Sequence, residues 1–541
     1  MYTLTQNSGV WLISIGLFFQ LSLLKAQSWT DLKQFGNAEN QEITVLGENQ
    51  AHLYFGGSFS GGLDIGTHRL QSQGGADIFI AQQSGPDQIL RILLQGGSLL
   101  DDAIDALAID AQGNLFVTGS FWTEIDFGTF VLESPPESPK ALFLIKISPE
   151  GALLWSQVFT KGSVKGINSI ALDTQGGVLL GGYFSEEIEF ADTVLQSPAR
   201  SAAFYALLTS TGDLQWSRAI GKTGNTRING VSTFEGTYYQ VAGYYDDTLS
   251  LAGQTFPANT NDQDVFLLSM DTAGEIRWVR KAGGVFDETV ADMVNDSLGN
   301  TYLCGQLVGV MRLNDSLSIQ SRDGNADCFL LKYDSLGQAI WAKSFGGDRL
   351  QFVNDLLIDK GKLTMCGAFQ DNLFLDDFSL TSTFEYDGYF AQINLDGEVI
   401  DLHALSAENG NVLPVLLSSF QEELIIGGAF SGQVQVAGLE ANASPGTFQI
   451  FLATWGAFLS ATQALIDDPA IQIFPNPASH TFSIQGVSNS YGIKVYNTAG
   501  QLILQQDRPN AEVGVQDWLP GLYFVHINLP KGQLVRKLMV H

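Results

Sequence analysis

The sequence contains little cysteine, and this shortage argues against two kinds of stabilised fold. Only three cysteines occur among 541 residues, namely Cys304, Cys328 and Cys366. Their number is odd and no pair has the spacing of a zinc site, so neither a disulfide framework nor a structural zinc is indicated. We expect buried thiols in a core, with one disulfide between two of them as the alternative.

Basic residues are scarce as well. The chain has 27 Lys and Arg against 57 Asp and Glu, which gives a formal net charge of −30. Such a surface repels polyanions, so we expect no nucleic-acid partner. Residues 470–541 hold five basic and three acidic residues, so the excess of negative charge lies in the earlier part of the chain.

Long apolar runs are absent except near the beginning of the sequence. Residues 10–24 form an apolar run of 15 residues, followed by the small residue Ala26 and then Gln27. A run of this length is short for a membrane span and predicts a signal peptide over residues 1–26, cleaved between Ala26 and Gln27. No Lys or Arg precedes the run, so an uncleaved anchor is the alternative. No other stretch is apolar enough to cross a membrane, so we expect no transmembrane anchor in the mature chain.

The sequence is rich instead in a glycine-centred strand, first seen as LYFGGSF at residues 53–59. Its glycine recurs every 61 to 63 residues, at Gly57, Gly119, Gly182, Gly243, Gly305, Gly367 and Gly428. So regular a period is typical of a repeat architecture. A glycine in mid-strand indicates close approach of another backbone or ring, which we expect where blades converge on an axis.

Each unit predicts β-structure alone, because β-branched and aromatic runs alternate with Gly, Asp and Asn and no helical period appears. In the third unit we expect strands at 167–173, 178–184 and 204–209, a fourth around Trp216, and a small hairpin at 188–197. Four strands in each of seven units predict an all-β, seven-bladed β-propeller over residues 27–457.

The two ends of this region predict how the ring closes. The seventh unit ends after its third strand, at residues 447–455, whereas residues 28–35 form an orphan strand after the signal peptide. We expect the orphan strand to complete the last blade, with Trp29 in the position of the tryptophan that recurs as Trp155 and Trp216.

The units also resemble bacterial seven-bladed β-propeller repeats. The resemblance is carried by Asp264-Val265-Phe266, Asp327-Cys328-Phe329, Gly113-Asn114 and Gly299-Asn300. It implies a scaffold over residues 27–457 and no particular activity, because propellers host many unrelated functions.

Residues 470–541 differ from the repeats and follow an expected linker at 458–469. Their short alternating strands predict a small β-sandwich. The segment closely resembles the type A C-terminal sorting domain of the type IX secretion system of Bacteroidetes. The residues that match include Pro475, Asn476, Pro477, Gly521, Tyr523, Arg536 and Lys537. The resemblance implies recognition by the type IX machinery, export across the outer membrane, removal of the domain, and release or attachment at the cell surface.

No catalytic motif emerges from the propeller region. His52, His68 and His403 have no partner at the spacing of a metal site or a catalytic triad. Several Asp-(Ser/Thr)-apolar tripeptides, Asp296-Ser297-Leu298 among them, resemble the O-glycosylation acceptor of Bacteroidetes. Turn formation is the alternative explanation of these tripeptides, since Asp caps local backbone N–H groups.

A ligand is expected on the face that carries the long connections and the links between blades, because binding residues concentrate in variable loops. Asp101, Asp102, Asp287 and Asp348 lie in these links and are weak candidates for a calcium site. Asp77, Asp264, Asp327 and Asp387 open the third strands on the same face. The alternative is a solvated acidic rim with no metal, and we expect no other cofactor.

The sequence therefore favours a secreted or surface-displayed propeller that binds an extracellular ligand, either a polysaccharide or a protein. Two other classes compete with this interpretation. One is a propeller hydrolase or lyase acting on extracellular polysaccharide or protein, and the other is a structural adhesin of the cell envelope.

Overall fold

The computed structural model describes residues 27–457 and 471–540, apart from residues 38, 50, 86–89, 191–192, 252, 259–261, 323, 437–438, 445, 487–491, 498–501, 507–511, 517 and 530–531. The expected signal peptide, with Ala26, and the expected linker 458–469 lie outside the described residues. The chain divides into a unit of Gln27–Ala457 and a second unit that takes in residues 458–541. Where the structure describes the chain, no helix has the length and apolar character needed to cross a membrane.

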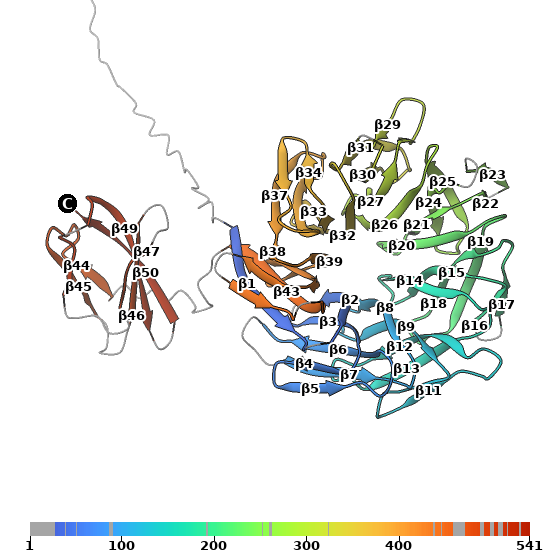
Figure 1. Ribbon diagram of the computed structural model, residues 1–541, viewed down its shortest axis with the longest axis horizontal. Coiled ribbons are helices and arrows are strands. Elements are labelled where there is room, and N and C mark those ends of the chain that lie inside the picture. Colours follow the sequence, from blue (N-terminus) through green and yellow to red (C-terminus); the bar gives the residue numbers. More distant parts are fainter. Residues whose placement is uncertain are drawn as a thin grey trace, which may run out of the picture. The chain divides into compact units, whose positions relative to one another are not determined.

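Seven four-stranded antiparallel sheets, called blades 1 to 7 in chain order, form a ring in the described part of the larger unit (Figure 1). Blade 1 consists of β2 (Gln41–Glu48), β3 (Leu53–Phe59), β6 (Asp77–Gln83) and β7 (Leu90–Gly96). Blade 2 consists of β8 (Ala103–Ile109), β9 (Leu115–Trp122), β12 (Lys140–Ile147) and β13 (Leu153–Phe159). Blade 3 consists of β14 (Lys165–Leu172), β15 (Val178–Phe184), β18 (Ala202–Leu208) and β19 (Leu214–Ile220). Blade 4 consists of β20 (Thr226–Phe234), β21 (Tyr238–Tyr245), β24 (Asp264–Asp271) and β25 (Ile276–Ala282). Blade 5 consists of β26 (Glu288–Asn295), β27 (Thr301–Val308), β30 (Ala326–Tyr333) and β31 (Ala339–Phe345). Blade 6 consists of β32 (Gln351–Asp359), β33 (Lys362–Phe369), β36 (Asp387–Asn394) and β37 (Val399–Leu405). Blade 7 is β39 (Val412–Phe420), β40 (Glu423–Phe430), β43 (Gln449–Ala457) and β1 (Gln27–Phe35). The predicted β-propeller is confirmed.

A small hairpin follows the second strand of each blade, as predicted for the third unit. The hairpins are β4 (Gly62–Ile65) with β5 (His68–Gln71), β10 (Glu124–Asp126) with β11 (Val131–Glu133), β16 (Glu187–Phe190) with β17 (Thr193–Gln196), β22 (Thr248–Leu251) with β23 (Gln254–Pro257), β28 (Val310–Arg312) with β29 (Ser318–Gln320), β34 (Asn372–Leu375) with β35 (Phe378–Thr381), and β41 (Gln433–Val436) with β42 (Leu439–Asn442). In the last case β38 (Ala407–Glu408) adds a third strand.

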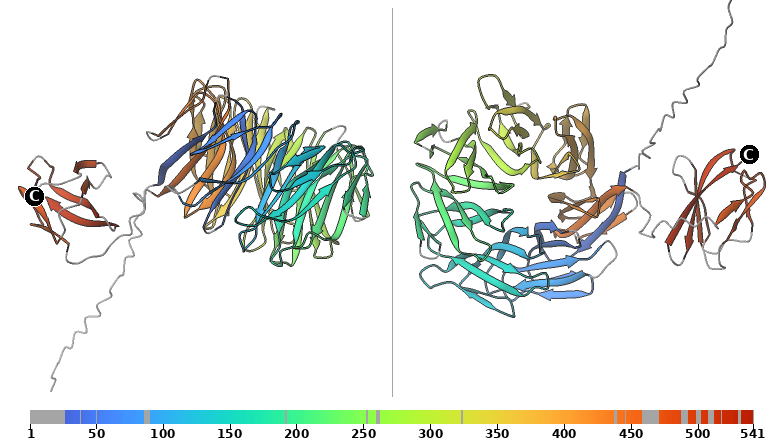
Figure 2. Two further views of the ribbon diagram at one scale, coloured as in Figure 1. Left: turned by 90° about the horizontal axis from the view of Figure 1, so that it is seen from below. Right: turned by 180° about the vertical axis from the view of Figure 1, so that it is seen from behind.

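The N-terminal strand closes the ring, as the sequence predicts. β1 pairs antiparallel with β43 from Gln27 opposite Ala457 to Phe35 opposite Ile450. The ring therefore has no open edge at its seam, since the first described strand completes the last blade. Figure 2 shows the same seam from behind, with β1 lying along the orange strands of blade 7.

The predicted equivalence of Trp29 with the repeated tryptophan is wrong. In blade 2 the repeated residue Trp155 lies directly after a bulge in the fourth strand. In β1 the residue directly after the bulge is Asp31, whereas Trp29 lies before it, opposite Trp455. Trp29 is buried and meets Trp455 and Phe390 with ring centroids 5.2 and 5.5 Å apart. Trp29 therefore stabilises the seam by packing against blade 6, and it does not occupy the position of the repeated tryptophan.

The repeat glycine lies opposite a bulge in the first strand of every blade. In blade 1, Gly57 pairs with Ile43, and the register shifts directly after Ile43. A Cβ built on Gly57 would lie 1.9 Å from the carbonyl oxygen of Glu42. The same carbonyl approach occurs at all seven repeat glycines, at 1.8 to 2.3 Å. The expected close approach is confirmed, but the bulge causes it and not convergence on the axis.

In blades 1, 3, 4 and 6 the residue at the bulge also joins its blade to the next one by a side-chain hydrogen bond. Thr44 donates to the Ile104 carbonyl at 2.8 Å, and Asn168 donates to the Ile228 carbonyl at 2.8 Å. In blades 5 and 6 the residue after the bulge is an aspartate that accepts a backbone N–H from the next blade. Asp292 accepts from Leu356 at 3.0 Å, and Asp355 accepts from Leu417 at 2.6 Å. These bonds form a belt along the first strands.

The repeated tryptophans stabilise the outer part of the ring. Trp155 Nε1 donates to the Ser210 carbonyl at 3.0 Å, and Trp216 Nε1 donates to the Thr272 carbonyl at 3.0 Å. Each acceptor lies in a turn of the next blade, so these rings pack blades together as expected. Cys304, Cys328 and Cys366 are buried and free, which confirms the expectation of buried thiols.

The second unit contains two small sheets. One consists of β44 (Gln472–Phe474), β45 (Thr481–Gln485) and β48 (Val513–Gly514), and the other of β47 (Leu502–Gln506), β46 (Gly492–Asn497), β49 (Gly521–Leu529) and β50 (Gly532–Val540). Apolar side chains of both sheets share one core, with Ile473 and Phe482 from the first sheet and Val495 and Val525 from the second. The arrangement agrees with the predicted small β-sandwich.

Closure of the propeller through β1 predicts that a single aromatic side chain of this strand has a large effect on stability. Replacing Trp29 by Ala should lower the free energy of unfolding by about 3 kcal/mol, because a buried ring is removed from the seam. Lys33→Ala on the same strand is the control and should cost less than about 1 kcal/mol, since it loses a partly exposed ion pair with Asp31. Both are measured by chemical denaturation, and equal stabilities of the two variants would contradict the closure.

Candidate functional site

The two faces of the ring differ in their connections. Short turns between first and second strands and between third and fourth strands lie on one face, called the turn face. The β-hairpins and the links between blades lie on the other, called the loop face, because alternate ends of antiparallel strands share a face. The candidate residues of the propeller, Asp101, Asp102, Asp287 and Asp348, all belong to the loop face.

Three of these four carboxylates are exposed and bind neighbouring chain atoms. Asp101 accepts the Ala76 N–H at 2.9 Å, and Asp287 accepts the Gln263 N–H at 3.0 Å. Asp348 accepts from the Asn372 side-chain amide at 2.7 Å. Ala76 and Gln263 each precede the third strand of the previous blade, so Asp101 and Asp287 serve as equivalent clips between a blade link and that strand.

The expected solvated acidic rim is wrong for the carboxyl groups between blades. Asp102 is 1% exposed, while Asp77, Asp264 and Glu288 are fully buried. They lie where the third strand of one blade and the first strand of the next begin. Burial raises the pKa of Asp77 to about 6 and the pKa of Asp102 to about 7.

The second such pair, Asp264 and Glu288, lies between blades 4 and 5. Glu288 Oε2 accepts the Gly284 N–H at 3.0 Å, while its Oε1 has no hydrogen-bond partner among the described residues. Burial first, and then the negative charge of Asp264, raise the pKa of Glu288 to about 9. Lys281, at 3.4 Å from Asp264, compensates the charge of that residue only in part, since burial still raises the pKa of Asp264.

No metal site is evident from this geometry in the described ranges. Among these residues, no group of three or more His, Cys, Asp or Glu side chains is placed to hold an ion. The suggestion of calcium at Asp101, Asp102, Asp287 and Asp348 therefore stays a prediction. The same holds for O-glycosylation, since Asp296 accepts the backbone N–H groups of Leu298 and Asn300 as a turn-capping residue does.

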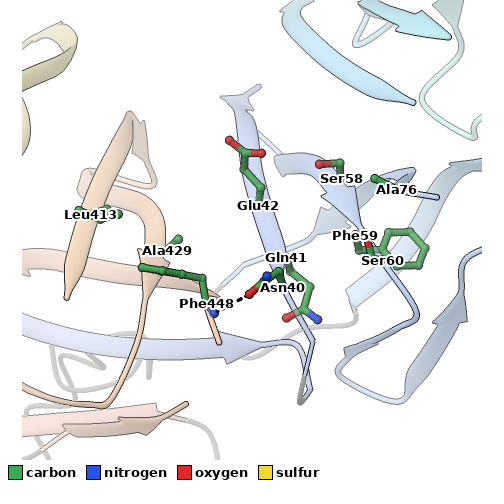
Figure 3. Close-up of a pocket in the computed structure, with 10 residues that line it drawn as sticks. All are labelled: Asn40, Gln41, Glu42, Ser58, Phe59, Ser60, Ala76, Leu413, Ala429 and Phe448. Carbon is green, nitrogen blue, oxygen red and sulfur yellow. Dashed lines mark hydrogen bonds between the residues drawn. The ribbon is translucent and has the colours of Figure 1, made fainter. Parts of the chain in front are cut away.

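A groove crosses the loop face at blades 6, 7 and 1. It consists of a hollow of about 390 Å³ between blades 7 and 1 and one of about 350 Å³ between blades 6 and 7. The two hollows share Leu413 and Phe448. Figure 3 shows the first hollow, with Leu413, Ala429 and Phe448 of blade 7 on one side and Glu42 and Ser58 of blade 1 on the other.

Comparison of the blades shows that the groove is not a property of the repeat. At the position that pairs with the residue directly after the repeat glycine, the first strands of blades 1 to 7 carry Glu42, Ala103, Gly166, Arg227, Thr289, Phe352 and Leu413. A second set of equivalent positions lies directly before the third-strand residue that pairs with the second residue after the repeat glycine. In blades 1 to 7 these positions hold Ala76, Lys140, Ser201, Gln263, Ala326, Tyr386 and Phe448. Large apolar or aromatic side chains occupy both positions only in blades 6 and 7.

The second-strand residue opposite these first-strand positions is small in blades 6 and 7, as it also is in blades 1 and 2, where it is Ser58 and Ser120. The second-strand partners of Phe352 and Leu413 are Ala368 and Ala429, whereas blades 3 and 4 have Tyr183 and Tyr244 there. Small residues here leave the hollow open beneath the aromatic side chains. The fold tolerates either kind of residue, so large first-strand residues opposite small ones, as in blades 6 and 7, point to function and not to the scaffold.

Sequence reasoning missed these residues, because they were hidden among apolar positions of a strongly apolar repeat. The signal was present in the sequence. Aligning the seven units by their glycines would have shown Phe352 and Tyr386 as departures from the repeat.

The residues expected to carry the sorting signal come together in the second unit. Asn476 Oδ1 accepts the Met539 N–H at 2.9 Å, and Asn476 Nδ2 donates to the Lys537 carbonyl at 2.6 Å. The segment Pro475 to Pro477 is thereby fixed against the last strand, β50. Gly521 pairs with Val540, and the Tyr523 hydroxyl donates to the Leu519 carbonyl at 2.7 Å.

The two basic residues of the ending differ in role. Arg536 Nε donates to the Ile471 carbonyl at 3.0 Å, which connects β50 to the start of the domain. The side chain of Lys537 is exposed. Lys537 is therefore the one of the two that presents its charge outward.

Residues 472–541 match the family described as the secretion system C-terminal sorting domain. The predicted sorting domain is therefore confirmed, and it directs export by the type IX secretion system to the cell surface or out of the cell. An uncharacterized WD repeat-containing protein of Acanthamoeba polyphaga mimivirus is 23% identical over 268 residues. That match covers 39% of this chain and only 19% of the viral protein.

Three solved structures have similar but distant arrangements. PorZ, an essential bacterial surface component of the type-IX secretion system of Porphyromonas gingivalis, is 11% identical with a TM-score of 0.23, covering 92% of this chain and 81% of PorZ. An ulvan lyase is 9% identical with a TM-score of 0.40, and the match covers 77% of this chain and 97% of the lyase. A putative 6-phosphogluconolactonase from Bacteroides uniformis is 13% identical with a TM-score of 0.36, and the match covers 69% of this chain and 94% of the lactonase. At these TM-scores the activities of those proteins carry no argument about this chain.

The buried carboxyl pair predicts a pH dependence of stability. The pKa of Glu288 is raised from 4.5 to about 9, so the folded chain keeps a proton that the unfolded chain releases. The stabilisation is complete below pH 4.5 and is lost as the pH rises toward 9. Glu288→Gln should therefore raise the melting temperature at pH 8 by at least ~2 °C and change it little at pH 4.

Asp287→Asn is the matched control for this experiment, because Asp287 is the exposed neighbour and Asn keeps an oxygen acceptor for the Gln263 N–H. Calorimetry at both pH values measures the effect. A Glu288→Gln variant that melts below the parent at pH 8 would contradict the assignment of a protonated Glu288.

Proposed function

We propose that the propeller is the ligand-binding part of the exported protein, and that it binds an extracellular ligand in the groove across blades 6, 7 and 1. The departure of blades 6 and 7 from the repeat carries this proposal. Phe352, Leu413, Tyr386 and Phe448 replace small or polar residues of the other blades and remain partly exposed. Partly exposed apolar and aromatic side chains that gather in a hollow are typical of ligand-binding sites, and we therefore explain them by a ligand.

The rest of the ring supplies a rigid support for this groove. The bulge residue Asn354 donates to the Pro414 carbonyl at 2.7 Å, which joins blades 6 and 7 beneath the groove. Asn411 accepts the Tyr386 N–H at 2.9 Å and so fixes the loop that carries this tyrosine. Preorganised lining residues favour binding because little conformational entropy is lost when the ligand arrives.

The lining of the groove supports binding over hydrolysis. Its single carboxylate among the described lining residues is Glu42. Hydrolysis of a glycoside commonly uses a pair of carboxyl groups on either side of the bond. Asp292 and Asp355 do share a side-chain hydrogen bond, but neither residue belongs to the lining, and both accept backbone N–H groups of the next blade.

A charge placed in the groove tests this proposal. The full chain is labelled and applied to an array of extracellular polysaccharides and matrix proteins. Leu413→Lys should abolish the signals of the parent protein, because a charged side chain would occupy the point that both hollows share. Thr289→Lys, at the equivalent position of blade 5, is the matched control and should bind like the parent. Equal binding by both variants would contradict the groove as the binding site.

Export provides a second prediction, since the two basic residues of the ending differ in role. Lys537→Ala should reduce the secreted fraction severalfold without changing the melting of the sorting domain, because its side chain is exposed. Arg536→Ala should lower both secretion and melting temperature, since it loses the bond to Ile471.

Immunoblots of the culture medium and periplasm of the native host measure the secreted fraction. Lys494→Ala, a basic residue of β46 away from the ending, is the control and should be secreted normally. Normal secretion of Lys537→Ala would show that the exposed charge is not read by the machinery.

A further inference from the structure

We infer that the ligand of the groove across blades 6, 7 and 1 is an uncharged polysaccharide chain, whose sugar rings stack on Phe352 and Tyr386. This inference rests on the proposed function and adds the chemical class of the ligand. Three features of the described residues lead to it, namely the aromatic faces, the amide groups beside them and the absence of cationic side chains from the lining.

The aromatic faces come first. Phe352 and Tyr386 lie with ring centroids 6.1 Å apart at an interplanar angle of 44°, and both are partly exposed. A pyranose ring presents axial C–H groups on one face, and their positive hydrogens are attracted to the negative face of an aromatic ring. Two tilted rings side by side can contact successive sugars of a chain, which turn relative to one another.

An amide group lies beside Tyr386 in one hollow, and another lies beside Phe448 in the other hollow. Asn411 uses its Oδ1 to hold the Tyr386 N–H, and Asn40 uses its Oδ1 to hold the Phe448 N–H at 3.2 Å. No hydrogen bond within the described residues engages Nδ2 of either asparagine. Each amide is therefore fixed at one end and offers a donor at the other, which suits the hydroxyl groups of a sugar.

The charge of the lining excludes an acidic chain. No Lys, Arg or His belongs to the described residues that line the two hollows, and Glu42 adds a negative charge. A carboxylated or sulfated polysaccharide would lose water around its charges without gaining a cationic partner. The net charge of −30 repels it further.

The shape of the groove favours a chain over a single sugar. The hollows of about 390 and 350 Å³ share the lining residues Leu413 and Phe448, so they are neighbours, and a ligand must be longer than a single sugar to occupy both. Each hollow alone has the size of a small-molecule site.

An apolar protein segment is the other macromolecule that such a groove could hold, and one substitution separates the two. Leu in place of Phe352 keeps an apolar side chain of similar size but removes the flat aromatic face. Stacking of a sugar would be lost, whereas packing of an apolar side chain would be retained.

Titration calorimetry of the full chain with uncharged hexasaccharides tests the inference. The probes are the hexamers of β-1,4-glucose, β-1,3-glucose, β-1,4-xylose and β-1,4-mannose, with hexagalacturonate as the charged counterpart. We expect at least one uncharged hexamer to bind and hexagalacturonate not to bind. Phe352→Leu and Tyr386→Leu should each weaken binding about tenfold. Tyr386→Phe should bind nearly as the parent does, and Tyr244→Leu on blade 4 is the matched control that should bind unchanged.

Two results would overturn the inference while leaving the proposed function intact. One is binding of hexagalacturonate alone. The other is a ligand from the array that is lost in Leu413→Lys but retained by Phe352→Leu, which would identify an apolar protein segment. If Leu413→Lys leaves array binding unchanged, the proposed function fails, and the inference fails with it.

Discussion

Close approach of two backbones within each blade is the constraint on which the propeller depends. The bulge in the first strand directs a carbonyl group at the second strand, and only glycine leaves room for it, since a Cβ on Gly243 would lie 1.8 Å from the Arg227 carbonyl oxygen. The bulge in turn exposes one residue of the first strand to the next blade. In blade 4 that residue is Asn229, whose amide donates to the Val290 carbonyl at 2.8 Å. The glycine and the bulge recur in every blade, and in blades 1, 3, 4, 5 and 6 a side chain at or next to the bulge adds a hydrogen bond to the next blade.

A scaffold so regular makes its departures informative. Residues that every blade needs recur with the repeat, such as the glycine and the third-strand aromatic residue that pairs with it, Phe79 opposite Gly57 in blade 1. Residues that bind a ligand need to be present only where the ligand lies. Phe352 and Tyr386 meet the second description, and their positions are filled by Ala, Ser, Thr, Gln or charged residues in most other blades. Internal comparison therefore separates scaffold from site within one sequence.

The fold also places the acidic residues of the chain in two different environments, the surface and the contacts between blades. Exposed carboxylates such as Asp101 and Asp287 clip the blade links to neighbouring strands. Other carboxyl groups, such as Glu288, are buried between blades, where loss of water raises their pKa. Acidity thus contributes solubility on the surface and a pH-dependent contact between blades, and the groove itself stays almost free of charge.

The sequence by itself determined the number and type of repeating units, the closure of the ring by the N-terminal strand, and the sorting domain, because glycine spacing, strand patterns and short motifs are local features. It did not determine that Trp29 falls before the bulge, because the register of a strand depends on its partner. It also did not show that Asp102 is buried or that Phe352 and Tyr386 meet. Burial and side-chain proximity arise only when strands separated by dozens of residues are brought together, and that arrangement belongs to the tertiary structure.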